Sequence, residues 1–191
     1  MKLVFATNNL NKLSEIRALV PSRIEILSLN DINCKDDLPE THTTLKGNAL
    51  QKAQYVFENY GFNCFADDTG LEIDALGGEP GVYSARYAGK DCNAEKNIKK
   101  VLKKLKGNYE REATFRTVIA LILDGKNTFF EGHCRGSITN TKSGIEGFGY
   151  DPIFTPNGFE KTFAEMTKHE KGTISHRGKA VKKLVEFLSI N

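Results

Sequence analysis

The chain has 191 residues, of which 39% are hydrophobic and 27% are charged, and these proportions are ordinary for a globular protein. A chain of this length can bury about 70% of the surface that its unfolded form would expose, so it needs neither disulfides nor a structural metal to fold. Its formal net charge is +3, close to balance, whereas a dedicated nucleic-acid-binding protein usually has a pI above about 9. Composition therefore excludes a small disulfide-stapled scaffold and disfavours a nucleic-acid coat protein.

No membrane or export signal is visible in the sequence. The longest unbroken apolar run, residues 118–123, has six residues, against the roughly 20 that a membrane helix needs. No basic and then apolar leader precedes residues 7–9. The four cysteines form no C-x-x-C pair, so neither a zinc site nor a disulfide framework is indicated. We expect a soluble, cytoplasmic protein with reduced thiols and no membrane partner.

In the first half of the chain, predicted strands and helices alternate. Short buried strands are predicted over residues 2–6, 24–28 and 63–66. One helix is predicted after the polar turn 7–11 and ends at Pro21, and a second ends near Gly61. A third helix is predicted over residues 93–106, where lysines occupy the face opposite the apolar one. This alternation is typical of an α/β fold.

In the second half the hydrophobic period changes to that of strands. Residues 114–123 and 128–133 are rich in β-branched and aromatic side chains and are joined by Asp124-Gly125-Lys126, a hairpin signal. A further strand is predicted near residues 135–140. The last helix follows Gly178, and one apolar stripe along it is formed by Ala180, Val181, Leu184, Val185 and Leu188. Together the elements predict an α/β fold on a mixed sheet, in a single domain.

The segment from Thr7 to Lys12 lies where a predicted strand ends and a helix begins. Backbone N–H groups, the helix dipole and the Lys12 ammonium can converge there on an anion such as a phosphate. Asn and Thr also cap helices without any ligand, and local sequence alone favours that alternative. No G-x-x-x-x-G-K-[ST] motif exists in the chain, and its glycines do not form the dinucleotide-binding fingerprint. An ordinary P-loop NTPase is therefore excluded.

Two adjacent carboxylates, Asp67 and Asp68, follow a predicted buried strand, at the sheet edge where α/β proteins usually bind ligands. A hard divalent cation is one explanation, because Mg²⁺ takes one or two carboxylates and bridges to substrate phosphates. The alternative is a turn, since Asp-Thr-Gly is common in turns, and local sequence leaves the two equally open. Glu40 is either a further ligand or an acid that leads into a helix, and local sequence favours the second alternative.

Two further segments carry groups suited to a flat base. Phe148-Gly149-Tyr150-Asp151 places two aromatic rings and a carboxylate in a glycine-flanked loop, although such aromatics are more often part of a core. Lys171, His176 and Arg177 supply three donors that can meet carbonyl oxygens on a base, although a lone His is usually structural.

Taken in order along nearly the whole chain, these residues resemble the inosine/xanthosine triphosphate pyrophosphatase family, enzymes that remove non-canonical purine nucleotides. The motifs that carry the resemblance are Thr7-x-Asn9-x-x-Lys12, Glu40-Thr41, Asn48-Ala49 with Lys52, Phe65-Ala-Asp-Asp-Thr-Gly-Leu71, Gly77-Gly78-x-Pro80-Gly81-Val-Tyr-Ser-Ala-Arg-Tyr87, Gly147-Phe-Gly-Tyr-Asp-Pro152 and Ser175-His-Arg-Gly178. Each motif is modest by itself, but the ordered set is specific.

The resemblance implies an elongated, two-lobed α/β protein, with residues 1–191 as one domain, a long mixed β-sheet with flanking helices, and a substrate cleft between the lobes. It implies a homodimer without a stable nucleic-acid partner. The implied reaction is hydrolysis of a purine nucleoside triphosphate such as ITP, dITP or XTP to the monophosphate and pyrophosphate. The implied cofactor is Mg²⁺.

The resemblance also assigns residues by position. Asp68, alone or with Asp67, orients or deprotonates the attacking water, and Glu40 and Asp68 are the implied Mg²⁺ ligands. The implied triphosphate contacts are Thr7, Asn8, Asn9, Leu10, Asn11, Lys12 and Lys52, with Thr69 as a nearby substrate contact. The implied base pocket consists of Phe148, Gly149, Tyr150, Asp151, Lys171, His176 and Arg177. The chain departs from the family at Gly47, where members often carry Glu that can support the outer shell of the metal.

Two rival hypotheses remain open at this level. One is a non-catalytic nucleic-acid-binding module that uses the lysine-rich segments 96–106 and 168–183, and it predicts binding that weakens steeply with salt. The other is a Maf-like pyrophosphatase that acts on pyrimidine or modified nucleotides on a similar fold.

Overall fold

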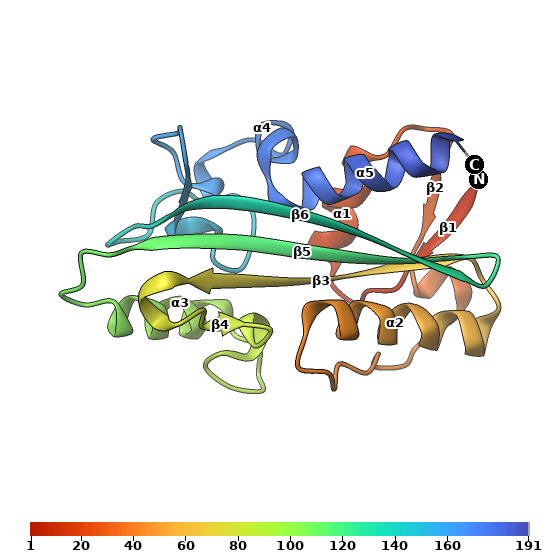
Figure 1. Cartoon of the computed structure of the whole chain (residues 1–191), viewed down its shortest axis with the longest axis horizontal. Helices are drawn as coiled ribbons and strands as arrows, with labels where there is room; N and C mark the ends of the chain where they lie inside the picture. Colours follow the sequence, from red (N-terminus) through yellow and green to blue (C-terminus); the bar gives the residue numbers. More distant parts are fainter. Residues whose placement is uncertain (191) are drawn as a thin grey trace. The chain divides into compact units, whose positions relative to one another are not determined.

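The computed structural model describes residues 1–190, and the chain divides into two compact units. Unit 1 comprises residues 1–68, 117–132 and those from 177 onward, and unit 2 comprises residues 69–116 and 133–176. Strands β3 (Cys64–Ile73), β5 (Glu112–Leu123) and β6 (Lys126–Ile138), which are labelled in Figure 1, each contribute residues to both units. The strand order is β2-β1-β3-β5-β6-β7, and β4 pairs with β3.

Unit 1 contains a parallel part of the sheet and most of the long helices. Its remaining elements are β1 (Lys2–Phe5), α1 (Leu10–Leu19), β2 (Glu25–Leu27), α2 (Leu45–Tyr60) and nearly all of α5 (His176–Ile190). Strand β1 pairs in parallel with both β2 and β3. A parallel neighbour requires a crossover connection, and α1 and α2 lie in the two connections that leave β1 and β2.

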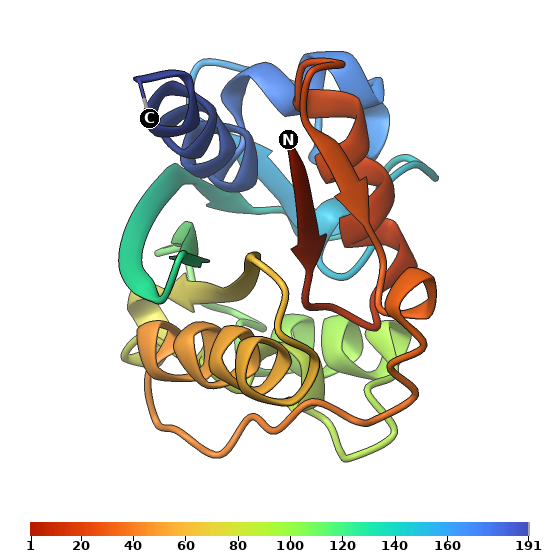
Figure 2. The same cartoon turned by 90° about the vertical axis from the view of Figure 1, so that its right-hand side faces the viewer.

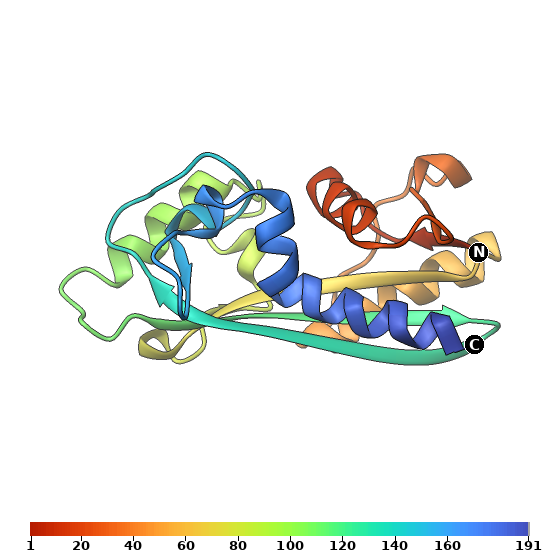
Figure 3. The same ribbon diagram turned by 90° about the horizontal axis from the view of Figure 1, so that it is seen from above.

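Strand alternation divides the interior of unit 1 into two cores. One face packs against α1 and α5 and includes Leu3, Phe5 and Phe65, with the rings of Phe5 and Phe65 stacked 4.7 Å apart. The other face packs against α2 and includes Val4 and Ala66. Figure 2 shows α2 on one side of these strands and α1 and α5 on the other. Figure 3 shows α5 lying along β6. The ring of Phe187 on α5 contacts that of Phe130 on β6. Consecutive residues of β3 therefore point to different helices.

Unit 2 contains β4 (Pro80–Gly81), α3 (Ala94–Lys104), β7 (Phe154–Pro156) and α4 (Lys168–Ile174). Pairing is antiparallel between β3 and β4 and between β6 and β7. The core of the unit is aromatic: Phe115 packs edge-on against Phe154, with ring centroids 4.7 Å apart, and Phe163 contacts both rings. Aliphatic side chains such as Leu71, Ile98 and Val101 complete this core.

The lysines of α3 are engaged within unit 2. Lys96 pairs with Asp91 at 2.6 Å and Lys104 with Glu79 at 2.5 Å. Lys100 donates to the carbonyl of Tyr87 at 2.5 Å. These contacts direct three of the lysines toward acceptors in the protein, which weakens the hypothesis that the segment is a nucleic-acid-binding surface.

Most predicted elements are confirmed. Helix α1 begins after Asn9, whose side chain accepts from the N–H groups of Asn11 and Lys12, and α2 ends at Gly61, which adopts the left-handed conformation. The hairpin turn between β5 and β6 is confirmed as well, because Asp124 and Gly125 both have positive φ, as a type I′ turn requires. All four cysteines are free thiols. No helix within residues 1–190 is both long and apolar enough to cross a membrane.

Several predicted boundaries are wrong. Strand β3 continues to Ile73, so Asp67 to Gly70 lie within a strand and the alternative that they form a turn is wrong. The strands predicted at 128–133 and near 135–140 are one strand, β6. Helix α5 begins at His176 rather than after Gly178, and α4 covers a segment that shows no helical periodicity. Strands β3 and β6 are longer than predicted because neighbouring strands supply hydrogen bonds that local sequence does not reveal.

Candidate active site

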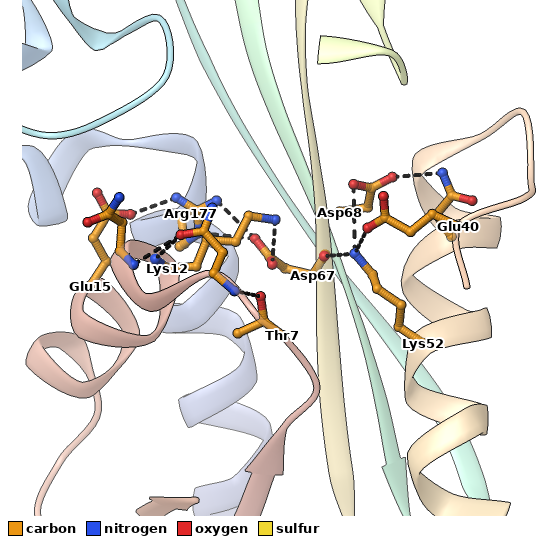
Figure 4. A network of polar contacts seen from close by, with 11 residues as sticks. Thr7, Lys12, Glu15, Glu40, Lys52, Asp67, Asp68 and Arg177 are labelled. Carbon is orange, nitrogen blue, oxygen red and sulfur yellow. Dashed lines mark hydrogen bonds and ion pairs between the residues drawn. The ribbon is translucent and has the colours of Figure 1, made fainter. Parts of the chain in front are cut away.

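Strand β3 directs its two adjacent carboxylates to opposite faces of the sheet. Phe65 and Asp67 share the face that packs against α1 and α5, and Ala66 and Asp68 share the face that packs against α2. Figure 4 shows Asp67 pointing toward Lys12 and Arg177, and Asp68 lying near Glu40 and Lys52. The two acids were expected to lie together at the end of a strand. They instead occupy two separate polar environments.

Asp67 is held by two cations. Its Oδ1 accepts from Lys12 Nζ at 2.9 Å, and its Oδ2 accepts from Arg177 Nε at 3.0 Å and Nη2 at 2.9 Å. Arg177 Nη1 also donates to Glu15 Oε2 at 2.6 Å, so the network reaches from β3 to α1 and α5. The Asp67 side chain is fully buried, and the Arg177 side chain is only 2% exposed.

These contacts shift the pKa values of the network. Burial raises the pKa of Asp67, but the charges of Lys12, Arg177 and Lys52 outweigh burial and hold the pKa of this carboxyl well below its usual range. Burial lowers the pKa of Lys12 more than its partner Asp67 raises it. Asp67 is therefore held in its ionised form and is a poor proton acceptor.

Asp68 has a different set of partners. Its Oδ2 accepts from the amide of Asn48 at 3.1 Å, and its Oδ1 lies 3.9 Å from Lys52 Nζ. The ammonium of Lys52 is closer to Glu40, at 2.5 Å from Oε1, and also donates to the backbone carbonyl of Asp67 at 2.8 Å. Burial raises the pKa of Asp68, and the lysine charges only partly oppose it. Asp68 thus carries a charge that its surroundings do not fully compensate.

Lys52, in the middle of α2, lies between the carboxylates of Glu40 and Asp68. Burial lowers its pKa, but the carboxylates of Asp68, Glu40 and Asp67 together outweigh burial and raise the pKa. The Lys52 side chain therefore stays charged beside these carboxylates. A charged ammonium can donate strong hydrogen bonds to anionic oxygens.

The chemistry of the donor set on this face suits a hard cation. Glu40 and Asp68 both supply carboxylate oxygens, both contact Lys52, and the charge on Asp68 is incompletely compensated. Mg²⁺ is commonly bound through one or two carboxylates and completes its shell with water and substrate oxygens. No group of three or more His, Cys, Asp or Glu side chains placed to hold a metal occurs within residues 1–190.

The segment from Thr7 to Lys12 forms an exposed corner between β1 and α1. The Oδ1 atom of Asn9 caps α1, as predicted by the alternative in which these residues cap a helix. Thr7 Oγ1 accepts a hydrogen bond from the Asn9 N–H at 3.2 Å. Asn8, Leu10 and Asn11 are exposed, and Leu10 is 73% exposed. The helix N-terminus is therefore open to solvent, with Lys12 directed back toward β3.

In unit 2, Asp151 and Lys171 form a buried ion pair. Lys171 Nζ lies 2.6 Å from Asp151 Oδ2, and the same oxygen accepts from the backbone N–H of Phe148 at 2.8 Å. A Cβ atom on Gly147 would lie 2.1 Å from that oxygen, so only glycine allows the carboxylate to approach the loop this closely. Lys171 Nζ also lies 5.0 Å from the centre of the Phe148 ring. The structure thus brings Phe148, Asp151 and Lys171 together.

The other residues predicted for the base pocket differ in their surroundings. His176 stacks on Phe115, with ring centroids 4.5 Å apart, and Phe163 contacts both His176 and Lys171. Tyr150 is buried in the core, and its hydroxyl donates to the Ser84 carbonyl at 2.8 Å. Phe148 and Gly149 remain half-buried, and so does Thr69 on β3. Of the two aromatic rings in the loop, Phe148 is therefore the one with exposed surface.

Two residues of these networks were not predicted from the sequence. Asn48 precedes Lys52 by four positions on α2, and Glu15 follows Lys12 by three positions on α1. Residues three or four apart share one face of a helix, so this spacing is a signal that could have found both. Asn48 was noted only as part of a motif, and Glu15 was not singled out.

Comparison with known proteins identifies the family. The model of the Ham1 family matches residues 3–187. A protein of Flavobacterium johnsoniae named dITP/XTP pyrophosphatase is 59% identical, and the alignment covers 99% of this chain and 98% of that protein. A protein of Christiangramia forsetii with the same name is also 59% identical, with coverage of 99% and 100%.

Solved structures agree with this assignment. A HAM1 protein from Coxiella burnetii is 36% identical, covers both chains completely and superposes with a TM-score of 0.90. The Staphylococcus aureus Ham1 protein is 38% identical, with a TM-score of 0.88 and coverage of 99% of this chain and 98% of that one. These matches confirm the family resemblance seen in the motifs. The chain belongs to the Ham1 family.

Proposed function

We propose that this protein hydrolyses non-canonical purine nucleoside triphosphates, such as dITP, ITP and XTP, to the monophosphate and pyrophosphate. Such a reaction cleans the nucleotide pool of bases that would mispair. The observation that carries the proposal is 59% identity over almost the whole chain with relatives named dITP/XTP pyrophosphatase. The Maf-like and nucleic-acid-binding hypotheses have no such support.

Asp68 is the residue we assign to the attacking water. A general base must be ionised and able to accept a proton at the pH of the reaction. Asp67 fails this requirement because cations hold both of its oxygens and its pKa is lowered. Asp68 meets it better, since burial outweighs the lysine charges around it and raises its pKa, while its Oδ2 accepts from the neutral amide of Asn48. We therefore assign to Asp68 the role of orienting or deprotonating the water that attacks the α-phosphorus, and to Asp67 the role of fixing Lys12.

Positive charge is required where the triphosphate binds, because proteins catalyse phosphoryl transfer mainly by positioning the reacting groups and neutralising their charge. We propose that Glu40 and Asp68 hold Mg²⁺, which when bound neutralises charge on phosphate oxygens. Lys52, charged and adjacent to both acids, is placed to bind the same oxygens. Lys12 and the exposed start of α1, residues 7–11, supply an ammonium and backbone N–H groups for the rest of the triphosphate.

Recognition of the base is assigned to unit 2. A 6-keto purine presents an acceptor where adenine presents a donor, so donors from Lys171 and His176 suit inosine and xanthosine. Phe148 offers the exposed ring surface for stacking, and Asp151 holds Lys171 in place. Arg177 was expected among these donors, but its guanidinium is engaged by Asp67 and Glu15. We therefore assign Arg177 to the support of Asp67 in unit 1, together with Lys12.

A substrate panel tests this assignment of function. An unpaired buried polar group costs about 1–3 kcal/mol, so each donor facing the amino group of adenine should lower kcat/KM by roughly 10- to 100-fold. We expect the kcat/KM values for dITP, ITP and XTP to exceed that for dATP by at least this factor, measured as pyrophosphate release. Equal kcat/KM for dITP and dATP, or a preference for thymidine triphosphate, would contradict the proposal.

The resemblance also supports two further proposals. We propose that the protein acts as a homodimer and that it works in the cytoplasm, where nucleotide pools are maintained. A sedimentation measurement of the purified protein addresses the first.

A further inference from the structure

Asn48 is a fully buried polar side chain that contacts the proposed catalytic carboxylate. It lies on the first turns of α2 with an exposed fraction of 0%. Its Nδ2 donates to Asp68 Oδ2 at 3.1 Å, and its Oδ1 accepts from the backbone N–H of His42 at 2.9 Å. Because an N–H can only donate and a carboxylate can only accept, the two partners fix which way the amide faces.

We infer that Asn48 is a positioning residue for Asp68: its amide, anchored at the oxygen by the backbone of His42, fixes the direction in which Asp68 presents its carboxylate. This inference rests on the proposed function and extends it to a residue outside the assigned catalytic and binding groups. Asn48 acts through Asp68, and no contact between Asn48 and substrate is required.

The type of partner explains why an amide is suited to this position. Asp67, which has a supporting role, is held by the cations Lys12 and Arg177. Asp68 accepts at its Oδ2 from the neutral amide of Asn48, and Lys52 Nζ lies 3.9 Å from its Oδ1. An amide restrains the rotation of a carboxylate without adding a charge that cancels it. The hydrogen bond from Asn48 therefore orients Asp68 without neutralising its charge.

The anchor of Asn48 depends on the glycine that precedes it. A Cβ atom on Gly47 would lie 2.7 Å from His42 Cβ and 2.8 Å from His42 Cγ, closer than such atoms approach in real structures. Gly47 has no positive φ, and glycine is a poorer helix former than alanine. Conformation therefore does not explain a glycine here, whereas the close approach of His42 does. The His42–Gly47 contact keeps the backbone N–H of His42 within reach of Asn48.

Three variants test the inference. Asn48→Ala removes the amide. Gly47→Ala keeps it but forces His42 away, while the added Ala favours the helix. Gln51→Ala is the matched control, because Gln51 also binds the segment before α2, through Thr41 N at 2.9 Å and Thr41 Oγ1 at 2.9 Å, without contacting Asp68. We would measure kcat and KM for dITP, the melting temperature, and Mg²⁺ affinity by calorimetry without nucleotide.

The inference predicts a loss of function that stability does not explain. A misplaced reacting group can cost up to about 100-fold in rate, so kcat of Asn48→Ala should fall at least about tenfold below that of Gln51→Ala. Gly47→Ala should lose activity in the same direction, with a melting temperature equal to or above that of the wild type. Adding His42→Gly to Gly47→Ala removes the clashing Cβ and should recover most of the loss. Mg²⁺ should bind more weakly to both Asn48→Ala and Gly47→Ala than to the control.

The outcomes separate this inference from the proposed function. If the wild type turns over dITP and both Asn48→Ala and Gly47→Ala match Gln51→Ala in kcat and in Mg²⁺ affinity, the positioning role is overturned while the proposed function stands. If Asn48→Ala does not fold, Gly47→Ala and its double variant decide by themselves. If the wild type releases no pyrophosphate from any purine triphosphate, the proposed function fails and the inference fails with it.

Discussion

Asp68→Asn is expected to lower kcat for dITP by about two to four orders of magnitude, the usual contribution of a general base, while leaving the protein folded. The substitution keeps the shape of the side chain and removes its charge. Burial already disfavours the ionised form of Asp68, as its raised pKa indicates. Removing that charge therefore relieves a desolvation cost, and the melting temperature should stay within a few degrees of the wild-type value.

The measurement pairs steady-state kinetics with a thermal melt of the same preparation. Glu95→Gln serves as a control, because Glu95 pairs with Lys142 in unit 2 with both side chains nearly half exposed. That variant should keep wild-type kcat. Near-normal turnover by Asp68→Asn would remove Asp68 from the reaction, and the assignment of Asp67 to a supporting role would then have to be reversed.

Asp67→Asn, unlike Asp68→Asn, should cause a large loss of stability. It leaves the ammonium of Lys12 and the guanidinium of Arg177 near a neutral amide in a buried network. Removing one partner of a buried ion pair typically costs about 3–5 kcal/mol. In a chain of this size, where 1 kcal/mol shifts the melting temperature by about 2–4 °C, the melting temperature should fall by roughly 6–20 °C.

The same Glu95→Gln variant provides the comparison for stability. An exposed ion pair contributes about 0–1 kcal/mol, so its loss should shift the melting temperature by only a few degrees. Differential scanning calorimetry of Asp67→Asn, Asp68→Asn and Glu95→Gln gives all three values. Equal melting temperatures for Asp67→Asn and Glu95→Gln would mean that the buried network does not hold unit 1 together.

The contrast between these two neighbours shows what sequence can and cannot predict. The motif containing Asp67 and Asp68 indicates a functional site, but local sequence leaves a turn and a metal site equally open. The difference in their roles follows from one fact, that β3 continues through both residues to Ile73. Strand alternation then separates the two carboxylates by face, and the strand is long because its neighbours supply the pairing.

Long-range partners could not be predicted either. Arg177 follows Asp67 by 110 residues, and nothing local indicates that its guanidinium binds that acid instead of belonging to the base pocket with Lys171. Only some of the residues predicted for the base pocket lie together. Phe148, Asp151 and Lys171 are in contact, whereas Tyr150 is buried in the core. Helix periodicity was the more reliable signal: α1, α2, α3 and α5 all occur where apolar residues recur at helical spacing.

The most direct test of the central claim is product analysis with dITP as substrate. Purified protein is incubated with dITP and Mg²⁺, and dIMP, pyrophosphate and orthophosphate are quantified together. We predict one pyrophosphate for each dIMP, no orthophosphate, and loss of both products when a chelator removes the metal. Release of orthophosphate with dIDP, or no release at all, would contradict hydrolysis between the α- and β-phosphates.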